Sequence, residues 1–145
     1  MINKKVRDIN EAISKINDNS VVLCSGFGSA GAPNDLLEAL AKTDINNLTI
    51  VSNNAGEGNY GLAKLLKSGK VAKIICSYPI SSGSVIFQNL YNSGRIQLEV
   101  VPQGTLSERI RAAGAGIGAF FTPTSAQTKL GENKETRFIE GIEHV

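Results

Sequence analysis

The stretch that decides the fold runs from Val21 to Leu40 and reads "VVLCSGFGSAGAPNDLLEAL". It begins with a short apolar run of the kind found in strands covered on both faces. Three glycines then fall within six residues, and a leucine-rich amphipathic segment follows. Pro33 suits the first turn of a helix there. A glycine-rich turn from a strand into a helix is a common place for a phosphate-bearing ligand.

The same alternation of strand and helix continues along the chain. Strands are expected at 20–24, 47–52, 71–78 and 96–101, and helices at 33–40, 60–69, 84–94 and 105–114. Short connections between such elements indicate right-handed βαβ units. The predicted fold class is therefore α/β, an open and mostly parallel sheet with helices on both faces. An amphipathic helix precedes it, and the tail around Gly141 predicts a small terminal β-hairpin.

Length and composition narrow the class of protein. A chain of 145 residues with 41% hydrophobic and 19% charged residues is expected to form one domain, residues 1–145. The net charge of +2 comes from interspersed acids and bases, which gives no basic field for nucleic acid. No apolar run is long enough for a signal peptide or a membrane span, so the expected compartment is the cytoplasm. Cys24 and Cys76 are interpreted as small buried strand residues, not as a disulfide or metal pair.

Ligands of open α/β sheets bind beyond the carboxyl ends of the strands. The four sequences at those ends are "SGFGSAG", "SNNAGEGN", "SYPISSGS" and "PQGT", all rich in glycine or amides. The first satisfies the dinucleotide-binding pattern Gly-x-Gly-x-x-Gly by its letters. An NAD site also needs an acid at the end of the second strand, where this chain has Ser52, Asn53 and Asn54. That counts against NAD and leaves open a tight turn without a ligand.

Gln103 is the most conspicuous polar residue at the fourth strand end. It follows Pro102 directly and precedes a helix, so its amide is placed to donate a hydrogen bond to a developing oxyanion. The alternative is a polar residue that caps the helix start. Further along this helix, Glu108, Arg109 and Arg111 are interpreted as a solvated or ion-paired face.

An attacking group is harder to find. The only histidine, His144, falls in the terminal hairpin, which argues against a histidine-based triad or a metal site. No serine occurs in a nucleophile-elbow pattern. Glu57, in a loop, is the only carboxylate near a strand end. The sequence thus predicts a ligand-binding site at the strand ends without an obvious nucleophile, and it predicts no metal site.

Three blocks carry a resemblance to a known family. "SGFGSAGAP", "LTIVSNNAG" and "VVPQGTLSERIRAAGAGIGAFFTPT", in this order, resemble the α subunit of family I CoA-transferases over essentially the whole chain. The chain departs at Cys24, where an aliphatic residue is usual, and at Ser25, where the family has a glycine. "CSYPISSGSVIFQNLYNSG" resembles the branch that acts on 3-oxoadipate and succinyl-CoA. Family α subunits continue past such a hairpin, so the chain is expected to be shortened at its C-terminus.

The resemblance implies a substrate, a partner and site residues. The substrate is coenzyme A as an acyl-CoA, with carboxylic acids as the other reactants and no covalently bound cofactor. The partner is a CoA-transferase β subunit, whose Ser-Glu-Asn-Gly motif bears the catalytic glutamate; this motif is absent here. Gln103 is the implied oxyanion donor, and Asn53 and Asn54 line the substrate cleft. The implied CoA-binding loop consists of Ser25, Gly26, Phe27, Gly28, Ser29, Ala30 and Gly31.

The predicted function is that of the CoA-binding, non-nucleophilic subunit of a heteromeric CoA-transferase. It would move CoA between succinyl-CoA and a 3-oxoacid, 3-oxoadipate first, through a glutamyl–CoA intermediate on the partner. One alternative is another acid pair, such as acetoacetate or short-chain fatty acids. A second is a truncated binding or assembly module without turnover. The segment "GAGIGAFFTPT", with Phe120 and Phe121, is a candidate part of the subunit interface, or else part of the domain core.

Overall fold

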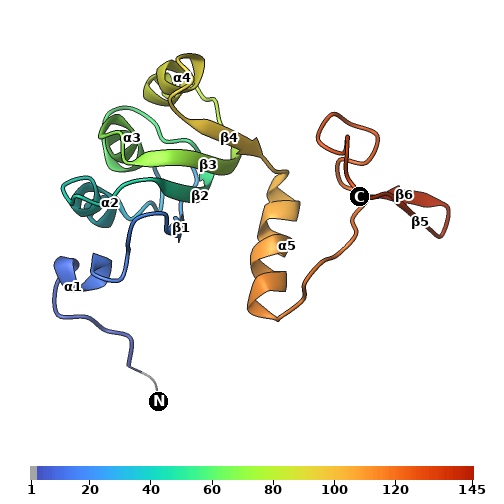
Figure 1. Ribbon diagram of the computed structural model, residues 1–145, viewed down its shortest axis with the longest axis horizontal. Helices are drawn as coiled ribbons and strands as arrows, with labels where there is room; N and C mark the ends of the chain where they lie inside the picture. Colours follow the sequence, from blue (N-terminus) through green and yellow to red (C-terminus); the bar gives the residue numbers. More distant parts are fainter. Residues whose placement is uncertain (1–2) are drawn as a thin grey trace. The chain divides into compact units, whose positions relative to one another are not determined.

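The computed structural model describes residues 3–145 and divides into two compact units. The N-terminal unit extends to Glu99, and the C-terminal unit runs from Val100 to Val145. The sequence predicted one domain over residues 1–145, and this stays a prediction. The helices are α1 (Ile9–Ile13), α2 (Asn34–Leu40), α3 (Gly61–Lys67), α4 (Val85–Asn92) and α5 (Gln103–Gly114). The strands are β1 (Val21–Leu23), β2 (Leu48–Asn54), β3 (Val71–Tyr78), β4 (Gln97–Val100), β5 (Arg137–Ile139) and β6 (Ile142–His144) (Figure 1).

The main sheet confirms the predicted α/β architecture. Its strands lie in the order β1-β2-β3-β4, so each new strand is added at the same edge. The pairs β1–β2 and β2–β3 are parallel, with Ile50 of β2 opposite Val22 on one side and Ile74 on the other. Right-handed crossovers that always step in one direction place their helices on the same face of the sheet. In the N-terminal unit α1 to α4 accordingly form one row (Figure 1), whereas the sequence predicted helices on both faces.

A single apolar layer lies between these helices and the sheet. Leu48 and Ile50 of β2 and Ile74 of β3 are completely buried there. Side chains alternate between the faces of a strand, so one set of strand residues meets all the helices. On the other face, within this unit, Val21 and Leu23 are 61% and 56% exposed. The helix residues of the core are Leu37, Leu40, Leu62, Leu65, Leu66 and Phe87.

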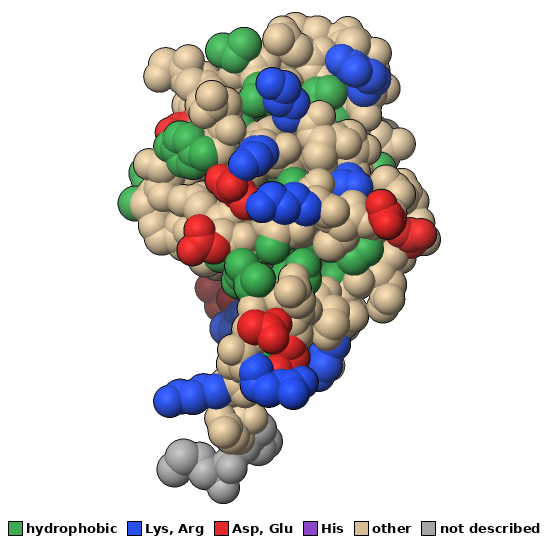
Figure 2. Space-filling model, turned by 90° about the vertical axis from the view of Figure 1, so that its left-hand side faces the viewer, with side chains coloured by type: hydrophobic (Ala, Val, Ile, Leu, Met, Phe, Trp, Pro, Cys, Tyr) green, Lys and Arg blue, Asp and Glu red, His purple; other side chains and the backbone are tan. Residues whose placement is uncertain are grey.

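Two ion pairs join neighbouring elements of the N-terminal unit. Lys64 of α3 donates to Glu38 of α2 over 2.6 Å, and Lys73 of β3 donates to Glu99 of β4 over the same distance. Ion pairs that remain partly accessible to solvent, as these do, add little stability. Figure 2 shows lysines, arginines and acids side by side on the face it presents, as expected from their interspersed order in the sequence. Among residues 3–145 no helix is long and apolar enough to cross a membrane.

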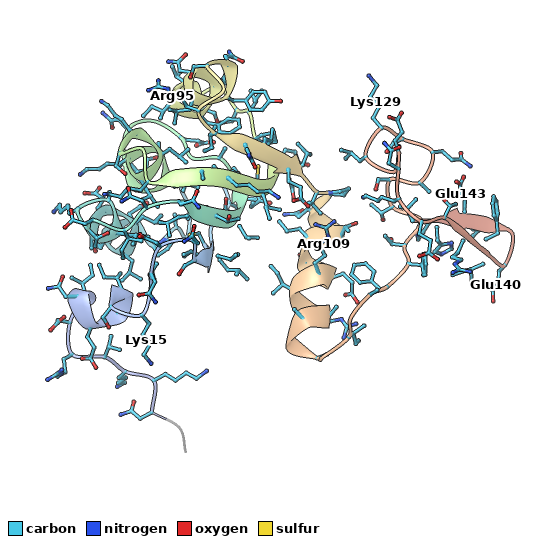
Figure 3. The ribbon with its side chains drawn as sticks, viewed as in Figure 1. Lys15, Arg95, Arg109, Lys129, Glu140 and Glu143 are labelled. Atoms are coloured by element: carbon cyan, nitrogen blue, oxygen red, sulfur yellow. The ribbon has the colours of Figure 1, made fainter. Side chains whose placement is uncertain are left out.

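The C-terminal unit contains α5 and the predicted hairpin of β5 and β6. Glu140 and Gly141, with φ angles of +51° and +78°, form its two-residue turn; Glu140 is labelled at the hairpin tip in Figure 3. Two positive φ angles match the type I′ turn that suits the twist of a hairpin. Thr122 exchanges two backbone hydrogen bonds with Val145, of 3.0 and 2.9 Å. On α5, Leu106 is buried, whereas Ile110 is 45% exposed.

Candidate functional site

The glycine loop connects β1 to α2. Its three glycines have φ angles that other residues rarely adopt: +123° at Gly26, +60° at Gly28 and +70° at Gly31. Phe27 and Ala30 exchange backbone hydrogen bonds of 2.9 and 3.1 Å, which close a tight turn with Gly28 inside it. The loop therefore needs glycine for its shape, independently of any ligand.

Two positions in and after this loop refine the interpretation of the sequence. Ser25 donates its hydroxyl hydrogen to the carbonyl of Gly31 over 2.9 Å and so ties the loop across its base. Pro33 is the residue before α2, not part of its first turn. The backbone N–H of Asn34 donates to the backbone carbonyl of Ala32 over 2.9 Å. The N–H group of Asn34 at the helix start is therefore already used within the chain.

Asn54 connects the end of β2 to the glycine loop. Its side chain, in a residue only 9% exposed, donates to the Gly28 carbonyl over 3.2 Å and accepts from the Gly56 amide over 2.9 Å. The Ser52 hydroxyl donates to the Asn54 carbonyl over 2.6 Å. Asn53 lies on the alternate face of β2 and is half-buried. The two asparagines that the sequence grouped together thus have different surroundings, and the side chain of Asn54 holds the loop.

A serine pair that the sequence analysis did not single out lies beside this site. The Ser81 hydroxyl donates to Glu57 Oε1 over 2.9 Å and lies 2.9 Å from the hydroxyl of Ser84. Ser84, almost completely buried, donates to the Gly56 carbonyl over 3.1 Å. These contacts join the loop after β2 to the loop after β3. The signal that could have found them is the repeated serine in "SYPISSGS".

A small pocket lies where these loops meet. Its volume is about 20 Å³, close to the space that one water molecule occupies. The structure brings most of the predicted loop together with both asparagines here. The pocket is lined by Cys24, Ser25, Gly26, Gly28, Ser29, Ala32, Asn34, Leu37, Ser52, Asn53, Asn54, Glu57, Tyr60 and Leu62.

Gln103 belongs to the C-terminal unit. It is the first residue of α5 and is exposed within the described chain. On the same helix, Glu108 and Arg111 form a bidentate pair with contacts of 2.6 to 3.0 Å, which confirms the predicted ion-paired face for those two residues. Arg109, labelled in Figure 3, instead lines an open pocket of about 330 Å³ with Thr105 and other residues of the C-terminal unit.

Neither cysteine is suited to act as a nucleophile at neutral pH. Both thiols are free; burial raises the pKa of Cys24 from 9.0 to about 11 and that of Cys76 to about 12. Because the thiolate is the reactive form, a raised pKa lowers reactivity. Cys76 is a buried residue of β3, as predicted, whereas Cys24 directly follows β1 and is half-buried.

We expect iodoacetamide to label both cysteines slowly at pH 7.5. The raised pKa of Cys24 leaves about a hundredfold less thiolate in the folded protein than in the unfolded chain. Mass spectrometry of the folded protein, with the guanidinium-unfolded chain as reference, measures the ratio. Since the unfolded thiols ionise first, stability should also fall from pH 9 towards pH 11–12. Equal labelling rates in the two states would contradict the burial of these thiols.

Comparison with known proteins places the chain in a family. The family described as "Coenzyme A transferase" matches residues 6–145. The chain belongs to this family. It is 53% identical to the α subunit of 3-oxoadipate CoA-transferase from Pseudomonas putida over 145 residues, which are 100% of this chain and 63% of the relative. It is 38% identical to the α subunit of succinyl-CoA:3-ketoacid coenzyme A transferase from Helicobacter pylori over 99% of this chain and 61% of that one. The chain thus spans less than two thirds of these curated relatives.

Solved structures show the same fold at low sequence identity. An acyl-CoA transferase of Escherichia coli, crystallised as a thioester complex with CoA, has a TM-score of 0.75 and 20% identity, covering 95% of this chain and 31% of that one. The decarboxylase AibA/AibB has a TM-score of 0.77 and 19% identity, covering 95% of this chain and 55% of its own. One of these proteins is named as a transferase and the other as a decarboxylase, so the shared fold alone does not specify a reaction.

Proposed function

We propose that this chain supplies the CoA-binding, non-nucleophilic part of a cytoplasmic CoA-transferase that moves CoA between succinyl-CoA and 3-oxoadipate. The observation that carries the proposal is the 53% identity, along the whole chain, to the α subunit of a 3-oxoadipate CoA-transferase. Identity falls to 38% for a succinyl-CoA:3-ketoacid relative, which favours 3-oxoadipate over acetoacetate as the acceptor.

The reaction needs a covalent carrier for CoA. In the proposed sequence, a glutamate carboxylate attacks the thioester carbonyl of succinyl-CoA and expels the CoA thiolate, leaving a mixed anhydride. The thiolate then attacks the glutamyl carbonyl, releases succinate and forms an enzyme–CoA thioester. The carboxylate of 3-oxoadipate repeats these steps in reverse and leaves as 3-oxoadipyl-CoA. Every step passes through an oxyanion, so fixed hydrogen-bond donors lower each barrier.

The surroundings of the strand ends support a nucleophile on a partner chain. Among the described residues, Glu57 is the one acid that lines the pocket at the end of β2, and its Oε1 already accepts a hydrogen bond from Ser81. We therefore assign the nucleophile to the β subunit, as the resemblance implies.

The remaining polar groups suit binding and stabilisation. Glycines 26, 28 and 31 let the backbone of the loop approach CoA closely, and Asn54 fixes that loop. The nucleotide and pantetheine of CoA supply binding energy that is used at the reacting thioester. Gln103 is assigned to the oxyanion as a neutral donor, and Asn53 to the substrate cleft.

A reconstitution experiment tests this function. The purified chain is mixed with succinyl-CoA and 3-oxoadipate, with and without a β subunit that carries the Ser-Glu-Asn-Gly motif, and 3-oxoadipyl-CoA is measured. We expect no transfer without the β subunit and transfer with it, accompanied by a glutamyl–CoA adduct on the β subunit in mass spectra. Parallel reactions with acetoacetate as the acceptor test the substrate assignment.

Two outcomes would overturn the proposal. Transfer by the chain alone, with an adduct on Glu57 or another of its own acids, would place the nucleophile here. No transfer with a β subunit that is active beside a full-length α subunit would favour a binding or assembly module.

A further inference from the structure

Glu57 lines the pocket at the end of β2, and the proposed reaction gives it no role. Its side chain lies between the glycine loop and the loop after β3. Its Oε1 accepts the hydroxyl hydrogen of Ser81 over 2.9 Å. Its Oε2 lies towards the glycine loop, because a Cβ added to Gly28 would be 3.6 Å from that oxygen. A Cβ added to Gly83 would be 3.2 Å from the Cβ of Glu57, so the loop after β3 also lies close. The side chain therefore fills the space between two strand-end loops.

The serine pair fixes the far side of this contact. Ser84 is 1% exposed, and its hydroxyl lies within hydrogen-bond distance of the Ser81 amide (3.1 Å), the Ser81 hydroxyl and the Gly56 carbonyl. The hydroxyl groups of Ser81 and Ser84 have one hydrogen each, and three acceptors lie within reach: Glu57 Oε1, the Gly56 carbonyl and the oxygen of the other serine. An ionised carboxylate is the strongest of these acceptors, so it takes the hydrogen of Ser81. The backbone bond from the Gly58 amide to the Gly83 carbonyl, of 2.9 Å, holds the same two loops together.

The near side of the contact is the glycine loop itself. Asn54 holds the carbonyl of Gly28 over 3.2 Å, and Glu57 lines the same small pocket as Gly28. Because Gly28 has no side chain, nothing in the residue itself resists a shift of the turn towards the pocket. Asn54 thus attaches the glycine loop to the end of β2, and the side chain of Glu57 lies between this loop and the loop after β3.

We propose that Glu57 is a positioning residue that holds the glycine loop in the conformation that binds CoA, acting through Ser81. This inference rests on the proposed function for its ligand, and on the contacts of the ligand-free chain for its geometry. The shape and hydrogen bonding of Glu57 then matter more than its charge. A glutamine can replace it, because the amide either accepts from Ser81 or donates to it while Ser81 donates to Ser84.

Kinetics of the complex with the β subunit test the role. We expect Glu57→Ala to raise KM for succinyl-CoA by about tenfold and to change kcat by less than about twofold, as for the loss of one hydrogen bond to a charged group used in binding. Glu57→Gln should stay within about threefold of the unmodified enzyme. If Glu57→Ala fails to fold, Ser81→Ala replaces it in the test. This variant keeps Glu57 in place and should show the same rise in KM, because it removes the same hydrogen bond. Glu38→Ala is the matched control, because Glu38 is also a hydrogen-bonded carboxylate but lies on α2.

Hydrogen exchange gives a second readout that does not depend on turnover. In the complex without substrate, amides of residues 26–31 should exchange faster in Glu57→Ala than in Glu57→Gln or Glu38→Ala. If the unmodified complex transfers no CoA, the proposed function fails, while the exchange pattern still decides the role of Glu57. Unchanged KM and exchange in Glu57→Ala would overturn the inference. A loss of kcat by a hundredfold in both Glu57 variants would overturn it too, and would indicate a catalytic carboxylate.

Discussion

Replacing Gly28 with valine is expected to abolish CoA binding by the chain assembled with the β subunit and to leave the N-terminal core folded. Gly28 has a φ angle of +60°, which a β-branched residue adopts only at a cost of about 1–3 kcal/mol. Its Cβ would lie in ordinary contact with Glu57 Oε2, at 3.6 Å, and the two additional methyl groups of valine must be accommodated beside that carboxylate. The turn between Phe27 and Ala30 must then open, and the surface that approaches CoA is lost.

The control has to carry the same backbone strain at another place. Gly94 has a φ angle of +70°, follows α4, and has no other atom within 4 Å of the position that a Cβ would take. Gly94→Val should therefore cost similar stability and leave CoA affinity unchanged. Isothermal titration with succinyl-CoA measures affinity, and thermal unfolding measures stability for both variants. If Gly28→Val binds CoA as well as Gly94→Val does, the glycine loop is a structural turn, as the sequence alternative allowed.

The order of elements could be predicted from the sequence because each element has a local signal. The third strand was expected at 71–78 and spans Val71–Tyr78, and the hairpin turn was marked by Gly141. The single row of helices in the N-terminal unit could not be predicted, because strand order is not encoded in a local pattern. Only the pairing of β1 with β2 and of β2 with β3 shows that the crossovers all step the same way.

In the candidate site, too, features with a local sequence signal could be predicted, and contacts between residues distant in the sequence could not. Glycines with positive φ angles and the amides after β2 could be picked out from the sequence, since residue type and position suffice. The contact of Ser81 with Glu57 could not, because it joins residues 24 positions apart and depends on two loop conformations. Asn53 and Asn54 are adjacent in the sequence, and the alternation along β2 alone separates their environments. Side-chain direction in loops therefore limited the prediction, more than residue type did.

Gln103→Ala is expected to lower kcat by about a hundredfold or more and to change CoA affinity little. Deletion of a single oxyanion donor in other enzymes has effects of this size. An oxyanion exists only in the intermediates and transition states of the proposed reaction, so its donor contributes to kcat and not to ground-state binding. The position suits this role: Gln103 follows β4 closely, opens α5, and is exposed in the described chain.

The alternative for Gln103 is a residue that holds the start of α5, and the kinetics separate the two roles. A structural residue would lower thermal stability and would affect KM and kcat together, whereas an oxyanion donor leaves stability and KM close to those of the unmodified enzyme. Gln97→Ala is the matched control, since Gln97 is an exposed glutamine at the start of β4, at the opposite end of the strand from its carboxyl end.

Gln103→Glu adds a second test. A carboxylate keeps the size of the side chain but removes the N–H donor and places a negative charge beside the developing oxyanion, so it should be slower than alanine. If glutamate at this position supports turnover better than alanine, Gln103 does not face the oxyanion.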